Sequence, residues 1–178
     1  MFRVFIDTNV LVYSVDERDP VKRQRARECM QQAEAAHAGV ISTQILQEFF
    51  VVITRKVMLA PLAARSLVDD LPPFDVVVVD VALVRQAMEA CIRNQLSLWD
   101  ALIVVSARRA RCNVIWTEEL SHGQIVDSVR IENPFLEAAG TGLGLVREVG
   151  TPYRVSGTHR QLRCADQRRR SKPNVAAP

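Results

Sequence analysis

Short apolar runs alternate with helical segments along the first 135 residues, and this alternation constrains the fold more than any other feature. The runs with strand character span residues 2–6, 39–42, 75–80, 113–117 and 128–135. Helical segments lie between them, at 9–15, 20–39, 43–56, 61–71, 81–94 and 97–110. Strands that alternate with helices form parallel sheets, because each crossover lays a helix on one face of the sheet. The pattern predicts a three-layer α/β/α fold with a short, mostly parallel central sheet.

Local signals support several of these boundaries. Asp19 followed by Pro20 pairs a capping side chain with a proline in the first helical turn. Ser97 with Asp100 three residues later has the spacing of a capping box. The stretch DVVVVD at 75–80 contains four consecutive valines, which predicts a strand buried on both faces.

Composition and cysteine spacing point to an ordinary globular protein. The chain has 178 residues, of which 48% are hydrophobic and 24% charged. No apolar run has the length of a membrane span, and the N-terminal MFRVFID lacks the pattern of a signal peptide. The four cysteines form no C-x-x-C pair and have no histidine at zinc-ligand spacing, so we expect reduced, packed thiols. We therefore expect a cytoplasmic protein without membrane contact.

Positive charge is concentrated toward the C-terminus. Residues 141–178 hold seven arginines and one lysine against two acidic residues, a net charge of +6. Since the whole chain carries +3, residues 1–140 carry −3. We expect one α/β domain at 1–138, then a glycine-rich linker and a poorly structured basic tail at 139–178. The tail either binds a polyanion such as RNA, through the cluster at 168–172, or is a solvated end.

Acidic residues stand where a parallel sheet binds ligands, at the carboxyl ends of strands. Asp7 follows the first strand, and Glu118 and Glu119 follow the strand at 113–117. Glu48 lies inside ILQEFFVVI, where seven of nine residues are apolar. A carboxylate in such surroundings needs a cation, hydrogen bonds or a proton, which makes it a candidate for a functional site.

Each acidic residue also has a structural explanation. Asp7 could cap a helix or form an Asx turn, and Asp100 could have no role beyond completing its capping box. Glu48 could reach solvent or pair with Arg55, and Glu118 and Glu119 could occupy an exposed turn. No single acidic residue therefore decides the function.

Taken together, the acidic residues and their neighbours resemble the PIN-domain nucleases, most closely the VapC-type toxins of bacterial toxin–antitoxin pairs. The resemblance covers residues 2–136 and rests on DTNVL, the acid in the apolar helix, SLWDALIVVSA, VIWTEEL and NPF. It implies that the catalytic residues are Asp7, Glu48, Asp100 and Glu119, with Thr8, Asn9 and Thr117 in support. Because the family more often has aspartate at the fourth position, Glu118 stays an alternative to Glu119.

The resemblance implies a metal-dependent ribonuclease that leaves a 5′-phosphate and a 3′-hydroxyl. The metal would be Mg²⁺ or Mn²⁺ on Asp7, Asp100 and Glu119, with Glu118 as the alternative ligand. Carboxylates without histidine or cysteine favour these ions over zinc. The resemblance also implies a cognate antitoxin, whose C-terminal segment lies in a groove between helices, and a homodimer.

An RNA substrate needs basic residues on the approach to an acidic pocket. The candidates are Arg108, Arg109 and Arg111, together with the basic face at 22–27, although either set could be a solvated helix face. Two other interpretations stay open. A phosphatase of the haloacid dehalogenase type needs a second acid two residues after Asp7, where Asn9 stands. A non-catalytic α/β interaction module would use its acids only as helix caps, and magnesium would not stabilise it.

Overall fold

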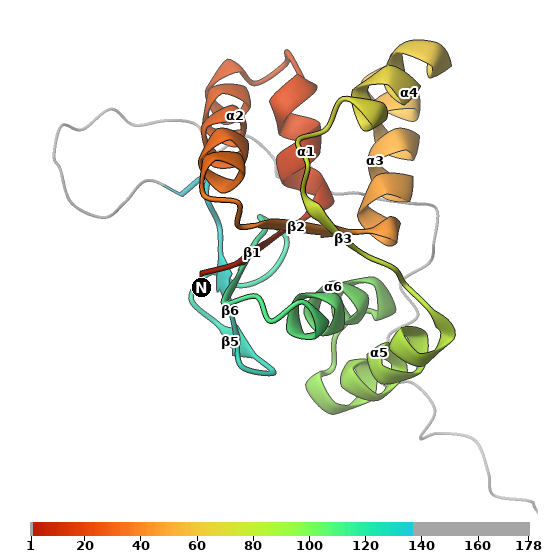
Figure 1. Cartoon of the computed structure of the whole chain (residues 1–178), viewed down its shortest axis with the longest axis vertical. Helices are drawn as coiled ribbons and strands as arrows, with labels where there is room; N and C mark the ends of the chain where they lie inside the picture. The colour runs from red at the N-terminus through yellow and green to blue at the C-terminus, as the bar shows by residue number, and fades with distance from the viewer. Residues whose placement is uncertain (1, 137–178) are drawn as a thin grey trace, which may run out of the picture.

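The computed structural model describes residues 2–136, which form three layers, with one sheet between two groups of helices (Figure 1). The predicted linker and basic tail at 139–178 lie outside the described residues. In chain order the elements are β1 (Val4–Ile6), α1 (Thr8–Val15), α2 (Pro20–Ala35), β2 (Gly39–Ser42), α3 (Thr43–Arg55), α4 (Pro61–Asp69), β3 (Asp75–Val77), α5 (Val81–Asn94), α6 (Leu98–Arg109), β4 (Val114–Trp116), β5 (Ile125–Val126) and β6 (Val129–Glu132).

The strands lie in the order β3-β2-β1-β4-β6-β5. The first four neighbouring pairs in that order are parallel, and β5 pairs with β6 in antiparallel fashion. Helices α1 to α4 cover one face of the sheet, and α5 and α6 cover the other (Figure 1). The predicted α/β/α fold with a mostly parallel sheet is confirmed.

The core centres on β1, whose three residues are fully buried between the two helical layers. A second, smaller apolar cluster joins α5 to α6 through Leu83, Cys91, Leu102 and neighbouring alanines. Cys29, Cys91 and Cys112 are buried, as small packing residues. Burial at the middle of the sheet fixes the position of the residue that follows β1, which is Asp7.

The prediction of a strand at 75–80 buried on both faces is wrong. Strand β3 covers three residues at the edge of the sheet, and Val76 and Val78 are 47% and 63% exposed. After β3 the chain leaves the sheet, and the Asp80 side chain accepts a hydrogen bond from Leu83 N to begin α5. Valine favours extended backbone at an edge as well as at the centre, so a valine run alone does not report burial.

Two further differences concern turns. Helix α2 ends at Ala35 rather than near residue 39, because His37 adopts a positive φ of 48° and reverses the chain into β2. Of the strand expected at 128–135, the structure has β6 at Val129–Glu132, and β5, which was not predicted, pairs with it across a turn with positive φ at Asp127 and Ser128. Such turns usually contain glycine, so no sequence signal marked this one. No helix among residues 2–136 combines the length and apolar character that a membrane span requires.

Gly39 at the start of β2 offers a test of the packing around this strand. A Cβ atom at Gly39 would lie 2.3 Å from Cδ1 of Phe74, which is itself 8% exposed. We expect Gly39→Ala to lower the free energy of unfolding by about 1–3 kcal/mol, because the ring must move within a packed core. Urea denaturation measures the change. In a Phe74→Ala background the same substitution should cost little, and an undiminished cost there would contradict the steric explanation.

Candidate active site

Strand pairing brings Asp7 and Thr117 together. Strands β1 and β4 are parallel neighbours in which Ile6 pairs with Trp116. Asp7 N donates to the Trp116 carbonyl at 3.1 Å, so the residues after the two strands start from the same edge of the sheet. This is the edge at which the sequence predicted a site.

Asp7 is 4% exposed and its carboxylate accepts three hydrogen bonds. Thr8 N donates to Oδ1 at 2.6 Å, which makes Asp7 the N-cap of α1. Asn9 Nδ2 at 2.8 Å and Thr117 Oγ1 at 2.6 Å donate to Oδ2. Thr8, Asn9 and Thr117 are all buried, and the supporting residues named from the sequence do surround Asp7.

Burial is the main reason that the pKa of Asp7 is raised to about 8, and the negative charges of Glu119 and Glu48 raise it further. The hydrogen bonds from Thr117 and Thr8 act in the opposite direction, because they stabilise the carboxylate. Glu48 and Glu119 are therefore within electrostatic reach of Asp7, although 41 and 112 residues separate them along the chain.

Glu48 lies in α3, and its carboxylate is held at both oxygens. Thr8 Oγ1 donates to Oε2 at 3.0 Å, and Gln44 Nε2 donates to Oε1 at 2.9 Å. Burial raises the pKa of Glu48, with a further contribution from Asp100. Glu48 therefore lies within reach of the other acidic residues. Its hydrogen bonds come from Thr8 and Gln44, rather than from solvent or from Arg55 as the structural alternatives supposed.

Asp100 lies in the first turn of α6, which Ser97 caps by accepting a hydrogen bond from Asp100 N at 3.1 Å. The Asp100 carboxylate in turn accepts a hydrogen bond from the Ser97 backbone and one from Ser97 Oγ at 2.7 Å, so the predicted capping box is present. Burial raises the pKa of Asp100. The same residue thus serves as a capping group and contributes to the electrostatic field at Glu48.

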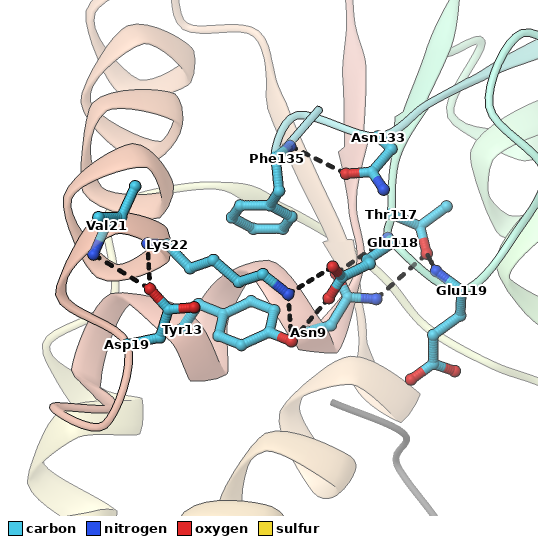
Figure 2. A network of polar contacts seen from close by, with 10 residues as sticks. All are labelled: Asn9, Tyr13, Asp19, Val21, Lys22, Thr117, Glu118, Glu119, Asn133 and Phe135. Atoms are coloured by element: carbon cyan, nitrogen blue, oxygen red, sulfur yellow. Dashed lines mark hydrogen bonds and ion pairs between the residues drawn. The ribbon is translucent and has the colours of Figure 1, made fainter. Parts of the chain in front are cut away.

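Glu118 and Glu119 have different surroundings. Glu118 accepts a hydrogen bond from Tyr13 and forms an ion pair with Lys22. Glu119 instead adds to the negative electrostatic field at Asp7. Glu119 N donates to Thr117 Oγ1 at 3.1 Å, which ties this residue to the Asp7 hydrogen bonds. Figure 2 shows the two carboxylates on opposite sides of the segment that follows β4. The geometry favours Glu119 over Glu118 as the fourth acid.

Three helices begin at this cluster of Asp7, Glu48, Asp100 and Glu119, which we call the acidic site. Asp7 caps α1, Gln44 and Glu48 lie in the first turns of α3, and Asp100 lies in the first turn of α6. Gln44 Nε2 also lies 3.4 Å from the Trp99 carbonyl, which joins α3 to α6. Helix N-termini carry partial positive charge and donate free N–H groups, so they stabilise carboxylates and also attract phosphate.

The comparisons with known proteins agree with this arrangement. The sequence profile of the PIN domain matches residues 4–122, which contain all four acids. The chain belongs to the PIN-domain family. No curated protein matches the sequence.

Solved structures similar to this PIN domain are toxins and toxin–antitoxin complexes. DNA-bound VapBC from Salmonella typhimurium has a TM-score of 0.57 at 18% identity, covering 75% of this chain and 99% of that one. A toxin–antitoxin complex from Klebsiella pneumoniae has a TM-score of 0.55 at 16% identity, covering 74% and 97%. VapC20 of Mycobacterium tuberculosis, a sarcin-ricin loop cleaving toxin, has a TM-score of 0.52 at 19% identity, covering 65% and 91%. At these identities the likeness establishes the fold.

The donor set of this PIN domain fits a hard divalent cation. The acidic site offers carboxylate oxygens, and the buried Gln44 Oε1 has no hydrogen-bond partner among residues 2–136. A cation would offset the burial and repulsion that raise the pKa of Asp7. Within residues 2–136, however, no three histidine, cysteine, aspartate or glutamate side chains are arranged so that they could hold a metal ion. The metal ligands named from the sequence therefore stay a prediction.

The arginines named as RNA contacts lie at the far end of α6. Eight residues separate Asp100 from Arg108, a rise of about 12 Å along the helix. Arg108 pairs with Asp127 at 3.1 Å and Arg109 with Asp80 at 2.8 Å. Their role in binding RNA, like that of Arg111, stays a prediction.

Sequence reasoning missed three residues near the acidic site. Gln44 bridges α3 and α6, as described above. Burial lowers the pKa of Lys56, the positive charge of Arg18 lowers it as well, and the negative charge of Glu119 opposes both. Lys56 therefore lies within electrostatic reach of Glu119, and Arg18 lies within reach of Lys56. The only sequence signal was the position of these two residues, since Lys56 follows α3, which contains Glu48, and Arg18 follows α1, which Asp7 caps.

The raised pKa of Asp7 gives a stability prediction. The pKa of folded Asp7 is about 8, whereas the unfolded side chain has the ordinary aspartate pKa of 3.8, so the charged form destabilises the fold as pH rises between these values. In metal-free protein we expect Asp7→Asn to raise the free energy of unfolding by about 2 kcal/mol at pH 8 and to have no benefit below pH 4. Urea denaturation in EDTA across this range measures the difference.

Asp80→Asn is the matched control for that measurement. Asp80 also caps a helix, but its carboxylate is exposed and the hydrogen bond from Arg109 lowers its pKa. Asparagine caps about as well as aspartate, so this change should not stabilise the protein at pH 8. A loss of stability in Asp7→Asn that is independent of pH would contradict the electrostatic account.

Proposed function

We propose that this protein is a divalent-metal-dependent endoribonuclease, and the toxin component of a type II toxin–antitoxin system. The observation that supports the proposal is the burial of Asp7 at the sheet edge of a PIN domain, within electrostatic reach of Glu119 and Glu48, while Asp100 in turn acts on Glu48. Among the similar structures, one is a toxin that cleaves the sarcin-ricin loop and others are VapBC complexes. Activity on RNA and use of Mg²⁺ or Mn²⁺ are the parts to be tested.

Each side chain has a definite part in this proposal. Asp7 and Asp100 would be the central ligands of the ion, with Glu119 as a further ligand. Glu48, held by Thr8 and Gln44, would orient the attacking water or a second ion. A bound divalent ion would lower the pKa of water and stabilise negative charge on the phosphate. Thr117 and Asn9 fix the direction of the Asp7 carboxylate, because both donate to Oδ2, and these hydrogen bonds favour its charged form without offsetting the burial.

Substrate binding follows from the charges around the site. The N-termini of α1, α3 and α6 would receive a phosphate group of the RNA backbone. Lys56, within electrostatic reach of Glu119, and Arg18, within reach of Lys56, would contact neighbouring phosphates. A longer RNA could also contact Arg108, Arg109 and Arg111, because the length of α6 separates these arginines from Asp100.

The proposal includes two protein partners and a cellular location. Apolar side chains are exposed on α3 and α4, including Val51 and Leu62, and on α5, including Val81 and Ile92. Exposed apolar patches often mark protein interfaces. We assign these surfaces to a cognate antitoxin and to a second copy of the chain, without deciding which surface binds which. An RNA substrate favours the cytoplasm.

Cleavage of purified RNA tests the activity. Incubation with total RNA in Mg²⁺ should give discrete fragments with 5′-phosphate and 3′-hydroxyl ends, and EDTA should prevent cleavage. Asp7→Asn and Asp100→Asn should each lower the cleavage rate at least about 100-fold while circular dichroism stays unchanged, because each removes a charged ligand. Asp19→Asn, which alters an acidic cap on α2, is the control and should cleave as the wild type does.

The alternatives make different predictions for the same samples. A non-catalytic interaction module would show neither cleavage nor a magnesium-dependent rise in melting temperature. A phosphatase would release inorganic phosphate from small phosphate esters, although Asn9, rather than an acid, donates to Asp7 here. Retained RNA cleavage in both Asp7→Asn and Asp100→Asn would refute the proposed function.

A further inference from the structure

Lys22 in α2 joins three side chains that lie far apart in the sequence. Its Nζ forms an ion pair with Glu118 and donates to Tyr13 OH at 3.2 Å (Figure 2). The same ammonium group lies 4.6 Å from the centre of the Tyr13 ring and 5.7 Å from that of Phe135. The Lys22 and Glu118 side chains are only 18% and 12% exposed. A charge pair that is withdrawn from water to this extent holds its partners firmly, since separation would leave either charge uncompensated.

The second oxygen of Glu118 is also occupied. Tyr13 OH donates to Glu118 Oε2 at 2.6 Å, while Lys22 binds Oε1. The Tyr13 ring in turn packs edge to face against Phe135 at 4.9 Å between ring centres. Glu118 is thus fixed by groups on α1 and α2, on the side of the chain away from Glu119.

The backbone carries this constraint into the acidic site. Glu118 N donates to Asn9 Oδ1 at 3.4 Å, and Asn9 Nδ2 donates to Asp7. Glu119 N donates to Thr117 Oγ1, whose hydroxyl donates to Asp7 Oδ2. One peptide bond therefore separates the residue that Lys22 holds from the residue whose charge acts on Asp7.

We propose that Lys22 is a positioning residue, which holds Glu118 on the far side of the segment after β4 and so directs Glu119 toward Asp7. The inference rests on the proposed function, because it concerns the acid that would complete the metal ligands. Lys22 also neutralises Glu118, which would otherwise bring one more negative charge to a place where carboxylates already repel one another.

A merely structural role for Lys22 is the competing explanation, because the same contacts also fasten α2 to the end of the sheet. The two explanations differ in their dependence on Glu119. If Lys22 acts through Glu119, its replacement has no further effect on metal binding once Glu119 is replaced. If Lys22 only stabilises the fold, the two effects are independent and additive.

The experiment uses the full chain and five variants. Lys22→Met keeps the unbranched stem and removes the charge, Lys22→Arg keeps the charge, and Glu119→Gln removes the acid that is positioned. The double variant Lys22→Met with Glu119→Gln closes the cycle. Arg65→Met is the matched control, because Arg65 forms an exposed ion pair on α4 and its loss changes the net charge equally. Two readouts are taken: the Mn²⁺ concentration that gives half of the rise in melting temperature, and amide hydrogen exchange of residues 117–120 without metal.

In Lys22→Met we expect the Mn²⁺ midpoint to rise about 10-fold, as for other losses of a group that orients a ligand. Exchange at residues 117–120 should become faster at the same time. Lys22→Arg should restore the midpoint to within about threefold of the wild type, and Arg65→Met should leave it unchanged. In the Glu119→Gln background, Lys22→Met should leave the midpoint unchanged.

A 10-fold shift that persists in the Glu119→Gln background would overturn the positioning role, as would a wild-type midpoint in Lys22→Met. If Lys22→Met does not fold, Tyr13→Phe provides the same test, because it removes only the hydroxyl that ties Glu118 to α1. Tyr13→Phe should then shift the midpoint in the same direction, by about threefold, and no shift would overturn the inference. A wild type that neither responds to Mn²⁺ nor cleaves RNA would instead overturn the proposed function.

Discussion

The Asp7 carboxylate is buried at the end of the central strand, and the other polar residues of the site are arranged around it. Strand β1 is enclosed by the core, so Asp7 is only 4% exposed and depends on the donors of Thr8, Asn9 and Thr117. Those donors do not fully offset the burial and the neighbouring acids, and the pKa of Asp7 stays raised. A protein that served only as a scaffold would gain stability from an uncharged residue here. The unfavourable electrostatics therefore point to a function that uses the charge.

The fold supplies this arrangement through four elements. Parallel pairing of β1 with β4 aligns Asp7 with Thr117, and the N-terminal turns of α3 and α6 bring in Glu48 and Asp100. The links between them are hydrogen bonds from Thr8 to Glu48 and from Gln44 to both Glu48 and Trp99. A change in the length of any connecting segment can be absorbed on the surface, whereas a shift in strand register would separate Asp7 from Thr117.

Much of this arrangement could be predicted from the sequence, for reasons that particular residues make clear. Caps at Asp19 and Ser97 are local signals, and the structure has both helices starting where those signals place them. Asp7 and Glu119 could be assigned to one edge because parallel strands end on the same side of a sheet. Glu48 was a candidate functional residue because its neighbours in the sequence are apolar, but only the fold shows that Thr8 and Gln44 donate hydrogen bonds to it.

Other features depend on contacts between distant segments and left no local signal. The edge position of β3 follows from strand order, which the valines at 76–79 do not encode. The choice between Glu118 and Glu119 depends on Lys22 and Tyr13, about 100 residues earlier in the chain. Likewise, Arg108 and Arg109 looked suited to RNA because they follow Asp100 in sequence, but a helix of this length places them far from it.

The most direct test of the central claim is to locate a divalent ion in crystals of the protein grown or soaked with Mn²⁺. Anomalous scattering identifies manganese without reference to activity. The account predicts a peak within about 2–2.5 Å of an Asp7 carboxylate oxygen, with Asp100 or Glu119 as a second protein ligand. A protein that binds Mn²⁺ only elsewhere, or that shows no peak at Asp7 at saturating Mn²⁺, would contradict it.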